Sequence, residues 1–284
     1  MVKLSIASWS FHRLLESGQQ DMFKYITDCK DLGATQLDPW NGHLAPLIAG
    51  DQAMKAGRVP NGQLSAVEKD YLAQVKTAAE EAGLPFGCLA VDGAHIYEAT
   101  PEARALNRAV AYRWLEAASL LGAAQIRVDA GGPPEMPDDA FAIIVEGYQD
   151  LIGRAHQLGI ELLIENHWGP SPIPENLTRI LDAVPGLGLL FDTNNFQGDK
   201  ERAWEMFAGY AVSVHIKTFS FDEQGNDPSV DLSKAIRLLA AAGYNGAWGV
   251  ESVPRDGDEY GEVKKTVALI RRTLEGICRP SRHR

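Results

Sequence analysis

The chain has 284 residues, of which 45% are apolar and 23% charged, and a formal net charge of −11. These proportions are ordinary for a soluble globular protein, and the length suffices for one α/β barrel or two small domains. The acidity argues against nucleic acid as the main partner, because such binding depends on clustered Lys and Arg, and the chain has only a short basic tail at 279–284.

No segment predicts a membrane span or a leader. No run approaches the roughly 18 apolar residues of a membrane helix, and the first apolar stretch is too short for a signal peptide. The three cysteines are too few and too widely spaced for a disulfide framework or a zinc ribbon. We therefore expect a cytoplasmic protein that binds neither membranes nor nucleic acid.

Short apolar runs alternate with segments of helical spacing along the whole chain. Apolar stripes at 67–79 and 263–277 are typical of helices that cover a sheet. The intervening runs predict eight strands, at about 3–7, 35–38, 86–91, 124–129, 160–165, 187–192, 212–217 and 247–251.

Helix boundaries carry recognisable signals. A glycine follows several helical segments and precedes the next strand, as expected of a helix that ends in the left-handed conformation: Gly33, Gly83, Gly122, Gly159 and Gly243. Thr100 and Asp231 stand where N-caps are expected, and Pro101 follows the first of them.

Eight strand–helix units predict a parallel sheet closed into a single (β/α)8 TIM barrel over residues 1–284. The rival, an open doubly wound sheet, usually has a glycine-rich loop after its first strand, where this chain has SWSFHRLL. The segment at about 39–63 is rich in Pro and Gly and is predicted to be a long loop over the barrel mouth.

Polar residues end four consecutive apolar runs: Glu165, Asp192, His215 and Glu251. A charge at the end of a buried strand needs a partner, and the carboxyl ends of barrel strands meet at one face. Three carboxylates and one imidazole are a suitable ligand set for a divalent cation. The mainly oxygen set favours Mn²⁺ or Mg²⁺, while Co²⁺, Fe²⁺ and Zn²⁺ are also compatible.

Strand parity adds neighbours to this set. Residues i and i+2 share a face, so Lys217 is expected beside His215, and His167 beyond Glu165. Lys217 could bind a substrate oxygen, carry a proton or pair with a carboxylate, and His167 could donate to a hydroxyl or be structural. Arg127 and Asp129 share a face too and are predicted to form an ion pair inside the barrel.

Further residues near the mouth are candidates for substrate binding. Aromatic rings there can pack on the C–H face of a sugar, although a core or lid role fits them equally. His12 and His43 offer hydrogen bonds, and Arg255 could meet an anionic group or be solvated. The candidates are Trp9, His12, Trp40, His43, Trp168, Asn195 and Arg255.

The ordered motifs resemble the xylose isomerase-like sugar phosphate isomerase/epimerase superfamily of metal-dependent TIM barrels. The resemblance covers nearly the whole chain and rests on LLIENHWG (162–169), GLLFDTNNF (188–196), VSVHIKT (212–218) and GVES (249–252), with IASWSF and LDPWNGHL earlier in the chain.

The resemblance implies that Glu165, Asp192, His215 and Glu251 hold the metal. It also implies that the two glutamates move protons on carbons next to a carbonyl, and that the protein could be a homo-oligomer. The chain departs from the family's ketose 3-epimerases, which have a His where this chain has Asn195 and an Arg near Ser220 and Phe221. These departures argue against 3-epimerisation of free ketoses. Seven His residues without an HxH pair, and the acidic charge, argue against the zinc endonuclease branch.

Three hypotheses follow. The leading one is a metal-dependent isomerase or epimerase of a small sugar or polyol-derived carbonyl compound, with Glu165, Glu251, Lys217 and His167 as catalytic candidates. The second is a lyase that dehydrates an inosose or keto-sugar on the same barrel, with Lys217 or His167 as the leaving-group acid. The third is a barrel that binds a sugar without catalysis.

Overall fold

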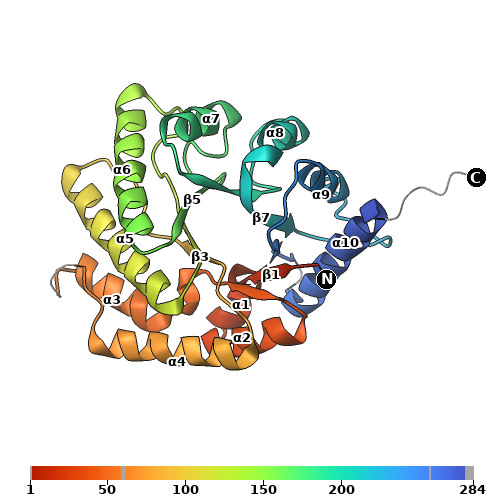
Figure 1. The fold of residues 1–284 in the computed structure, drawn as a ribbon, viewed down its shortest axis with the longest axis horizontal. Coiled ribbons are helices and arrows are strands. Elements are labelled where there is room, and N and C mark those ends of the chain that lie inside the picture. Colours follow the sequence, from red (N-terminus) through yellow and green to blue (C-terminus); the bar gives the residue numbers. More distant parts are fainter. Residues whose placement is uncertain (1, 59–61, 256, 279–284) are drawn as a thin grey trace, which may run out of the picture.

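Eight parallel strands form a nearly closed barrel in the computed structural model, which describes residues 2–58, 62–255 and 257–278 (Figure 1). The strand order is β2-β1-β8-β7-β6-β5-β4-β3, so each strand lies beside its neighbours in the sequence except that β1 pairs with β8. All eight predicted strands are confirmed to within two residues: β1 (Leu4–Ala7), β2 (Gln36–Asp38), β3 (Cys88–Val91), β4 (Gln125–Val128), β5 (Glu161–Glu165), β6 (Gly188–Asp192), β7 (Ala211–Thr218) and β8 (Trp248–Ser252).

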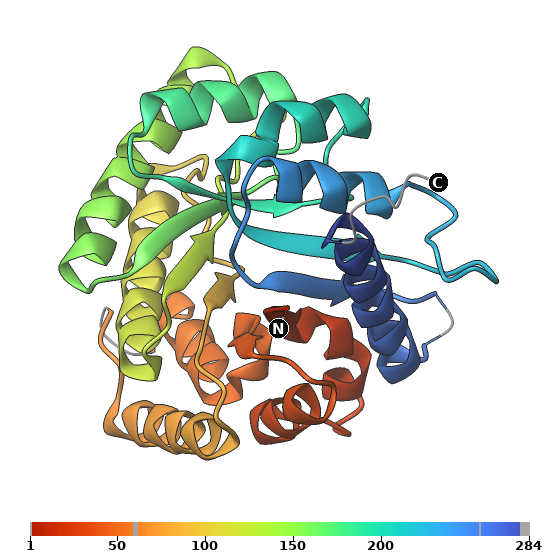
Figure 2. The ribbon, with the colours of Figure 1, turned by 45° about the vertical axis from the view of Figure 1, so that its right-hand side comes forward.

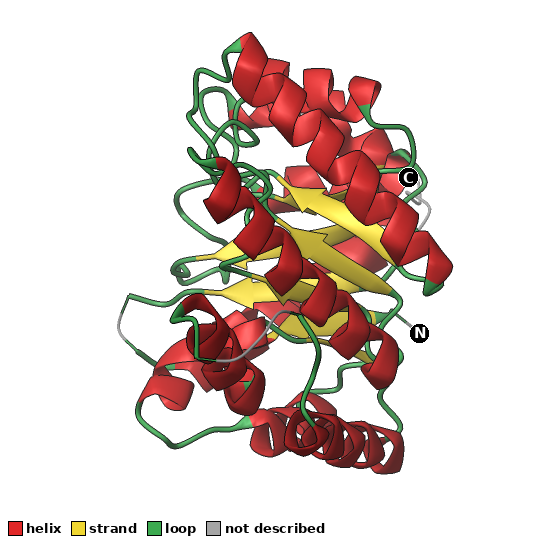
Figure 3. Ribbon diagram, turned by 90° about the vertical axis from the view of Figure 1, so that its left-hand side faces the viewer, coloured by secondary structure: helices red, strands yellow, loops and turns green. Residues whose placement is uncertain are grey.

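Helices surround the barrel, and the strands lie inside them (Figures 2 and 3). The apolar stripes of most of the longer helices face the sheet, whereas the helix at 66–82 packs mainly on two neighbouring helices, and together they build one large core of buried side chains. The helices are α1 (His12–Glu16), α2 (Met22–Asp31), α3 (Ala45–Lys55), α4 (Ala66–Ala82), α5 (Pro101–Leu121), α6 (Asp138–Gln157), α7 (Pro174–Ala183), α8 (Lys200–Phe207), α9 (Leu232–Ala241) and α10 (Glu259–Cys278). Within the described ranges, none of them is long and apolar enough to cross a membrane.

The seam between β2 and β3 is the weakest part of the barrel. Isolated bridges join Leu37 to Phe86 and Trp40 to Ala90, in place of a continuous ladder. β2 is only three residues long and Pro39 follows it, and a proline has no N–H to donate. The seam is held instead by backbone bonds such as Ala90 N to Pro39 O at 2.9 Å.

The predicted helix signals are confirmed. The five glycines named above all have positive φ, between 70° and 91°. The side chain of Thr100 accepts a hydrogen bond from Ala103 N, and that of Asp231 accepts one from Lys234 N. These caps satisfy helix N–H groups that have no partner within the helix, and so fix where each helix begins.

The prediction of a long loop at 39–63 is wrong for most of that segment. A short 3₁₀-helix (Asn41–His43) and α3 occupy it, while residues 59–61 lie outside the described part of the chain. Pro46 falls in the first turn of α3, where the missing N–H costs nothing. Buried Asp51 then ties the helix to α5, because it accepts hydrogen bonds from Arg113 Nε at 2.9 Å and Trp114 Nε1 at 2.7 Å.

Gly249 in β8 should be intolerant of a side chain. An added Cβ would lie 2.1 Å from Val214 O and 3.0 Å from His215 Cδ2, so β7 and β8 would have to move apart. We expect Gly249→Ala to lower the free energy of unfolding by about 2 kcal/mol or more. Urea denaturation followed by circular dichroism measures this.

Gly276 in α10 is the matched control, since an added Cβ there meets nothing within 4 Å. Gly276→Ala should leave stability unchanged or raise it by about 0.5–1 kcal/mol, as Ala favours a helix over Gly. A Gly249→Ala protein as stable as the control would contradict the close β7–β8 approach.

Candidate metal centre and substrate cavity

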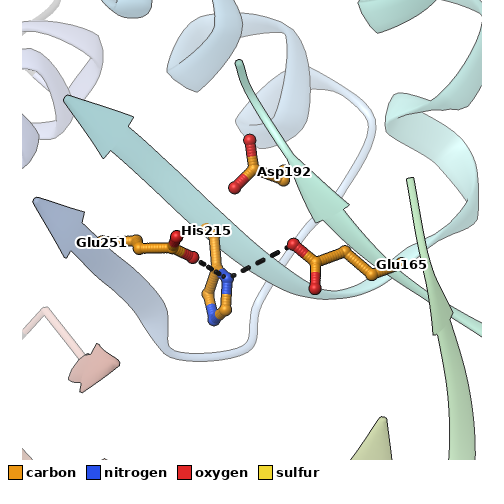
Figure 4. Close-up of side chains that lie close together, drawn as sticks. All are labelled: Glu165, Asp192, His215 and Glu251. Carbon is orange, nitrogen blue, oxygen red and sulfur yellow. Dashed lines mark ion pairs between the residues drawn. The ribbon is translucent and has the colours of Figure 1, made fainter. Parts of the chain in front are cut away.

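Four side chains converge at the carboxyl ends of β5 to β8 (Figure 4). Glu165, Asp192, His215 and Glu251 are buried, and each offers one ligand atom within 4.8 Å of the others. The Nδ1 atom of His215 lies 2.6 Å from Glu251 Oε2 and 3.8 Å from Glu165 Oε1. The convergence predicted from the strand ends is therefore present.

Lys217 supplies positive charge to this group. Its Nζ lies 2.8 Å from Glu251 Oε1 and 3.7 Å from Asp192 Oδ2. Burial disfavours the charged amine, but the carboxylates of Glu251 and Asp192 outweigh it and raise the pKa of Lys217. Lys217 is thus held as an ammonium ion at neutral pH.

The two glutamates are held ionised. Burial raises the pKa of a carboxyl, but the charges of His167 and Arg127 lower the pKa of Glu165 to about 2. For Glu251 the charges of Lys217 and His215 outweigh burial in the same way and lower its pKa well below the usual value. Asp192 differs, since burial dominates and raises its pKa to about 6.

One carboxylate oxygen of Asp192 has no hydrogen bond to any described residue and lies near the other three side chains of the set (Figure 4). Its Oδ1 accepts hydrogen bonds from Asn194 N at 2.7 Å and Asn195 N at 3.0 Å, which fix the orientation of the carboxylate. Its buried Oδ2 finds no hydrogen-bond donor among the described residues. An unsatisfied buried carboxylate oxygen is costly unless a cation meets it. This donor set of three carboxylates and an imidazole fits a divalent ion.

A second charged group surrounds Arg127 on β4. Its Nη1 lies 2.8 Å from both Asp92 Oδ1 and Asp129 Oδ2, and its Nε lies 3.0 Å from Glu165 Oε2. The predicted Arg127–Asp129 pair is confirmed. Asp92, Asp129 and His167 also have ligand atoms within 4.8 Å of one another. Arg127 already neutralises both of these aspartates, so this second group does not need a metal ion.

Most of these charged side chains, though not Asp129 or Asp192, line a cavity of about 420 Å³ at the barrel mouth. The volume falls in the usual range for small-molecule sites, about 300–1,000 Å³. The remaining lining is largely aromatic or small. The lining residues are Ala7, Trp9, Asp38, Trp40, Ala90, Asp92, Arg127, Glu165, His167, Trp168, Asn195, His215, Lys217, Phe219, Glu251 and Val253.

Most of the residues predicted from the sequence meet at this cavity. Lys217 and His167 line it, as parity requires, and so do Trp9, Trp40 and Trp168. One further candidate, Asn195, also lines it. Asn195 bridges the site, with Lys217 Nζ donating to its Oδ1 at 3.1 Å and its Nδ2 donating to Glu165 Oε1 at 3.2 Å. Asp129 orients His167, because their Oδ2 and Nδ1 atoms lie 3.2 Å apart.

Three predicted substrate-binding residues do not line the cavity. His12 lies behind Trp9, with the two rings stacked at 4.4 Å, and its Nδ1 bonds to Trp9 O. Arg255 is exposed and lies outside the lining. His43 is buried, 1% exposed, and satisfied by protein groups on both ring nitrogens.

His43 belongs to a chain of hydrogen bonds behind the mouth. Gln20 donates to Asp28, so its Oε1 is left to accept from His43 Nε2 at 3.1 Å. His43 Nδ1 then accepts from Ser8 Oγ at 3.1 Å, and Ser8 Oγ accepts from Trp40 N at 2.8 Å. This arrangement requires neutral His43, and burial lowers its pKa to about 4. His43 therefore helps to position Ser8 and Trp40 at the barrel mouth instead of binding substrate.

Three charged lining residues were not predicted as part of the site: Asp38, Asp92 and, beyond its ion pair, Arg127. The signal was available, because Asp38 ends β2 and Asp92 follows β3, as Glu165 ends β5. Asp38 is buried and accepts from Cys88 N at 2.9 Å, which ties it to the seam. The strand-end rule applied to all eight strands would have found both aspartates.

The chain belongs to the xylose isomerase-like TIM barrel family, whose model matches residues 26–273. Among solved structures, it is similar to 3-keto-D-glucoside 4-epimerase from E. coli, with a TM-score of 0.67, 17% identity and coverage of 89% of this chain and 95% of that one. It is also similar to the IOLI protein with a bound zinc atom, with a TM-score of 0.69, 15% identity and coverage of 97% and 98%. At these identities the likeness establishes the fold.

A curated relative is the C-glycoside deglycosidase alpha subunit of Microbacterium trichothecenolyticum, 38% identical over 66 residues. This match covers 22% of the present chain and 18% of the relative. The shared stretch is thus about a fifth of either protein.

The pKa of His43 predicts a pH dependence of stability. The unfolded chain binds a proton on His43 near pH 6.5 and the folded protein only near pH 4, so stability falls as pH falls through that window. Between pH 7.5 and 5 we expect a loss of about 2 kcal/mol from this residue. His43→Gln should remove that part of the slope in urea denaturation.

Exposed His156 provides the control, since His156→Gln should keep the wild-type slope. Equal slopes for wild type and His43→Gln would show that His43 is not held neutral by burial.

Proposed function

We propose that the protein is a divalent-metal-dependent isomerase or epimerase of a small sugar or sugar-derived carbonyl compound. The observation that carries the proposal is the buried set Glu165, Asp192, His215 and Glu251, of which all but Asp192 line a cavity of about 420 Å³. The family and the sugar epimerase among the structural relatives support it. The bound zinc in another relative supports a metal site, while Mn²⁺ and Mg²⁺ remain the ions that the oxygen-rich set favours.

These four residues would hold the ion. When bound, a divalent ion polarises a carbonyl and its neighbouring hydroxyl, which stabilises the negative charge left when a proton leaves the adjacent carbon. Asp192 and His215 lie between the two glutamates in the strand order. Glu165 and Glu251 would therefore approach a bound substrate from two sides.

The charges around the glutamates assign the proton-transfer roles. Glu165 and Glu251 are ionised at neutral pH, so either can take a proton from carbon. Lys217 is a protonated neighbour of Glu251, and the pKa of His167 is raised because the charges of Glu165 and Asp129 outweigh burial. Lys217 and His167 can therefore deliver a proton to an oxygen or to the opposite face of the carbon.

A lyase on the same site is the second candidate. It is favoured by the match to a C-glycoside deglycosidase subunit, because removing a group from a sugar carbon near a carbonyl, like loss of water there, can begin with removal of the proton next to that carbonyl. The base removes a proton from the carbon beside the carbonyl, and the group on the next carbon leaves with its bonding electrons and takes a proton from Lys217 or His167. Product analysis separates the candidates, since an isomerase conserves the mass of the substrate and a lyase releases water or the leaving group.

Metal binding tests the ligand set directly. We expect the purified protein to take up one Mn²⁺ per chain and to unfold at a higher temperature with excess Mn²⁺, as any ligand of the folded state stabilises it. Asp192→Asn should weaken Mn²⁺ binding by at least about 100-fold, since loss of a ligand exceeds the roughly 10–100-fold cost of losing a supporting contact. Titration calorimetry measures both proteins.

The exposed Asp70 on α4 is the control, and Asp70→Asn should bind Mn²⁺ like the wild type. Unchanged affinity in Asp192→Asn, or no uptake by the wild type, would reject this metal centre.

Proton transfer by the glutamates is tested by solvent exchange. In D₂O the wild type should incorporate deuterium next to the carbonyl of a keto-sugar from a panel, followed by NMR. Glu165→Gln should slow incorporation by about 10²–10⁴-fold, the usual contribution of a general base. Glu251→Gln should behave alike.

Glu161, exposed at the opposite end of β5, gives the matched control, and Glu161→Gln should exchange at the wild-type rate. A wild-type protein that binds keto-sugars and exchanges no deuterium would be a non-catalytic sugar-binding barrel, and the enzyme proposal would fail.

A further inference from the structure

The cavity has a charged half and an aromatic half. The four candidate metal ligands come from β5 to β8. Trp9 and Trp40 follow β1 and β2 on the other side of the barrel. Small side chains, Ala7 and Ala90, line the space near these two tryptophans. A sugar that reacts at the charged half therefore has a largely aromatic space beside it, which Asp38 and Asp92 also line.

Trp9 and Trp40 together form an aromatic wall, which hydrogen bonds and ring contacts hold in place. Trp40 Nε1 donates to Asp92 Oδ2 at 2.8 Å, and Trp40 N donates to Ser8 Oγ at 2.8 Å. Trp9 stacks on His12 at an interplanar angle of 9° and meets Trp40 edge to face at 4.7 Å. A surface fixed before the ligand arrives binds it with less loss of conformational entropy.

Trp168 stands on the opposite side of the mouth. It follows β5, which is four strands from β1 in either direction around the barrel. Its side chain is 58% exposed although it lines the cavity. Gly169 has φ +66°, and an added Cβ there would lie 2.7 Å from Gly131 O and Gly132 O, so its backbone packs closely on the loop after β4. The chain thus presents an exposed aromatic ring from a closely packed loop.

The charges of the cavity disfavour a phosphate. Arg127 pairs with three carboxylates, and Lys217 pairs with Glu251 and Asp192. Both histidines of the lining also face carboxylates. Each cation of the lining is therefore already paired with a carboxylate, so a phosphate dianion would find no uncommitted cation among the described lining residues to receive it.

We propose that the site takes an uncharged glycoside: a sugar ring at the charged half that carries a second ring, either an aromatic aglycone or another sugar, against Trp9, Trp40 and Trp168. This inference names the substrate class for the proposed sugar-converting site and so rests on it. Flat apolar faces of either kind pack well on indole rings, and the described lining offers a sugar phosphate no unpaired cation.

Calorimetric binding to the Mn²⁺-loaded protein tests the inference. The probes are methyl glucoside, phenyl glucoside and a glucose disaccharide, each in both anomeric forms, and glucose 6-phosphate. We expect a two-ring probe to bind about tenfold more tightly than methyl glucoside, and glucose 6-phosphate to bind no better than methyl glucoside. Whether phenyl glucoside or the disaccharide binds more tightly identifies the second ring.

Trp168→Ala should remove most of the advantage of the two-ring probe and leave methyl glucoside affinity within about threefold. Tyr210→Ala is the control, since Tyr210 is also exposed but precedes β7 at the other end of the barrel. Equal affinity for one-ring and two-ring probes, no binding of any glycoside, or tighter binding of glucose 6-phosphate would overturn the inference. These outcomes are independent of deuterium exchange, so failure of the proposed catalysis is seen separately.

Discussion

The structure depends on how three carboxylates can share one buried site. Glu165, Asp192 and Glu251 are each almost fully buried and lie close together. Three such charges repel one another and each loses its hydration, so the fold must supply positive charge at the same point. Lys217 and Arg127 do so from β7 and β4. Their contacts leave Asp192 Oδ2 without a hydrogen bond among the described residues, and a divalent ion would complete the balance.

The parallel barrel makes this concentration of charge possible. Its strands deliver their last residues to one face, and the side-chain alternation places His215 and Lys217 on the same side of β7. The close approach of Gly249 to Val214 and His215 keeps β7 against β8, so that His215 and Glu251 meet. The short β2 and its seam with β3 lie on the side of the barrel that carries Trp40, and the neighbouring β1 is followed by Trp9.

The sequence contained enough information to predict the strands and the four polar side chains that meet at their ends, because both follow from local pattern. A buried strand is a short apolar run, and a polar residue at its end is conspicuous. The positions of side chains beyond the strand ends were harder to predict. His12 and His43 lie near the mouth along the chain, but their side chains turn behind Trp9 and toward Gln20, which only tertiary packing decides. The helix α3 was hidden by its Pro and Gly content, although its proline sits where helices accept one.

Arg127 links the two charged groups of the site. It contacts Glu165, one of the four candidate metal ligands, on one side and Asp92 and Asp129 on the other. Asp92 in turn accepts a hydrogen bond from the indole of Trp40. A change in the charge of Glu165 would therefore act on the same guanidinium that fixes the aromatic wall through Asp92. The carboxylates that would carry out proton transfer and the rings that would select the substrate are separate surfaces, but one buried cation supports both. For that reason substitutions on the rim, such as at exposed Trp168, can alter selectivity with little effect on the charged half, whereas loss of Arg127 would disturb both halves at once.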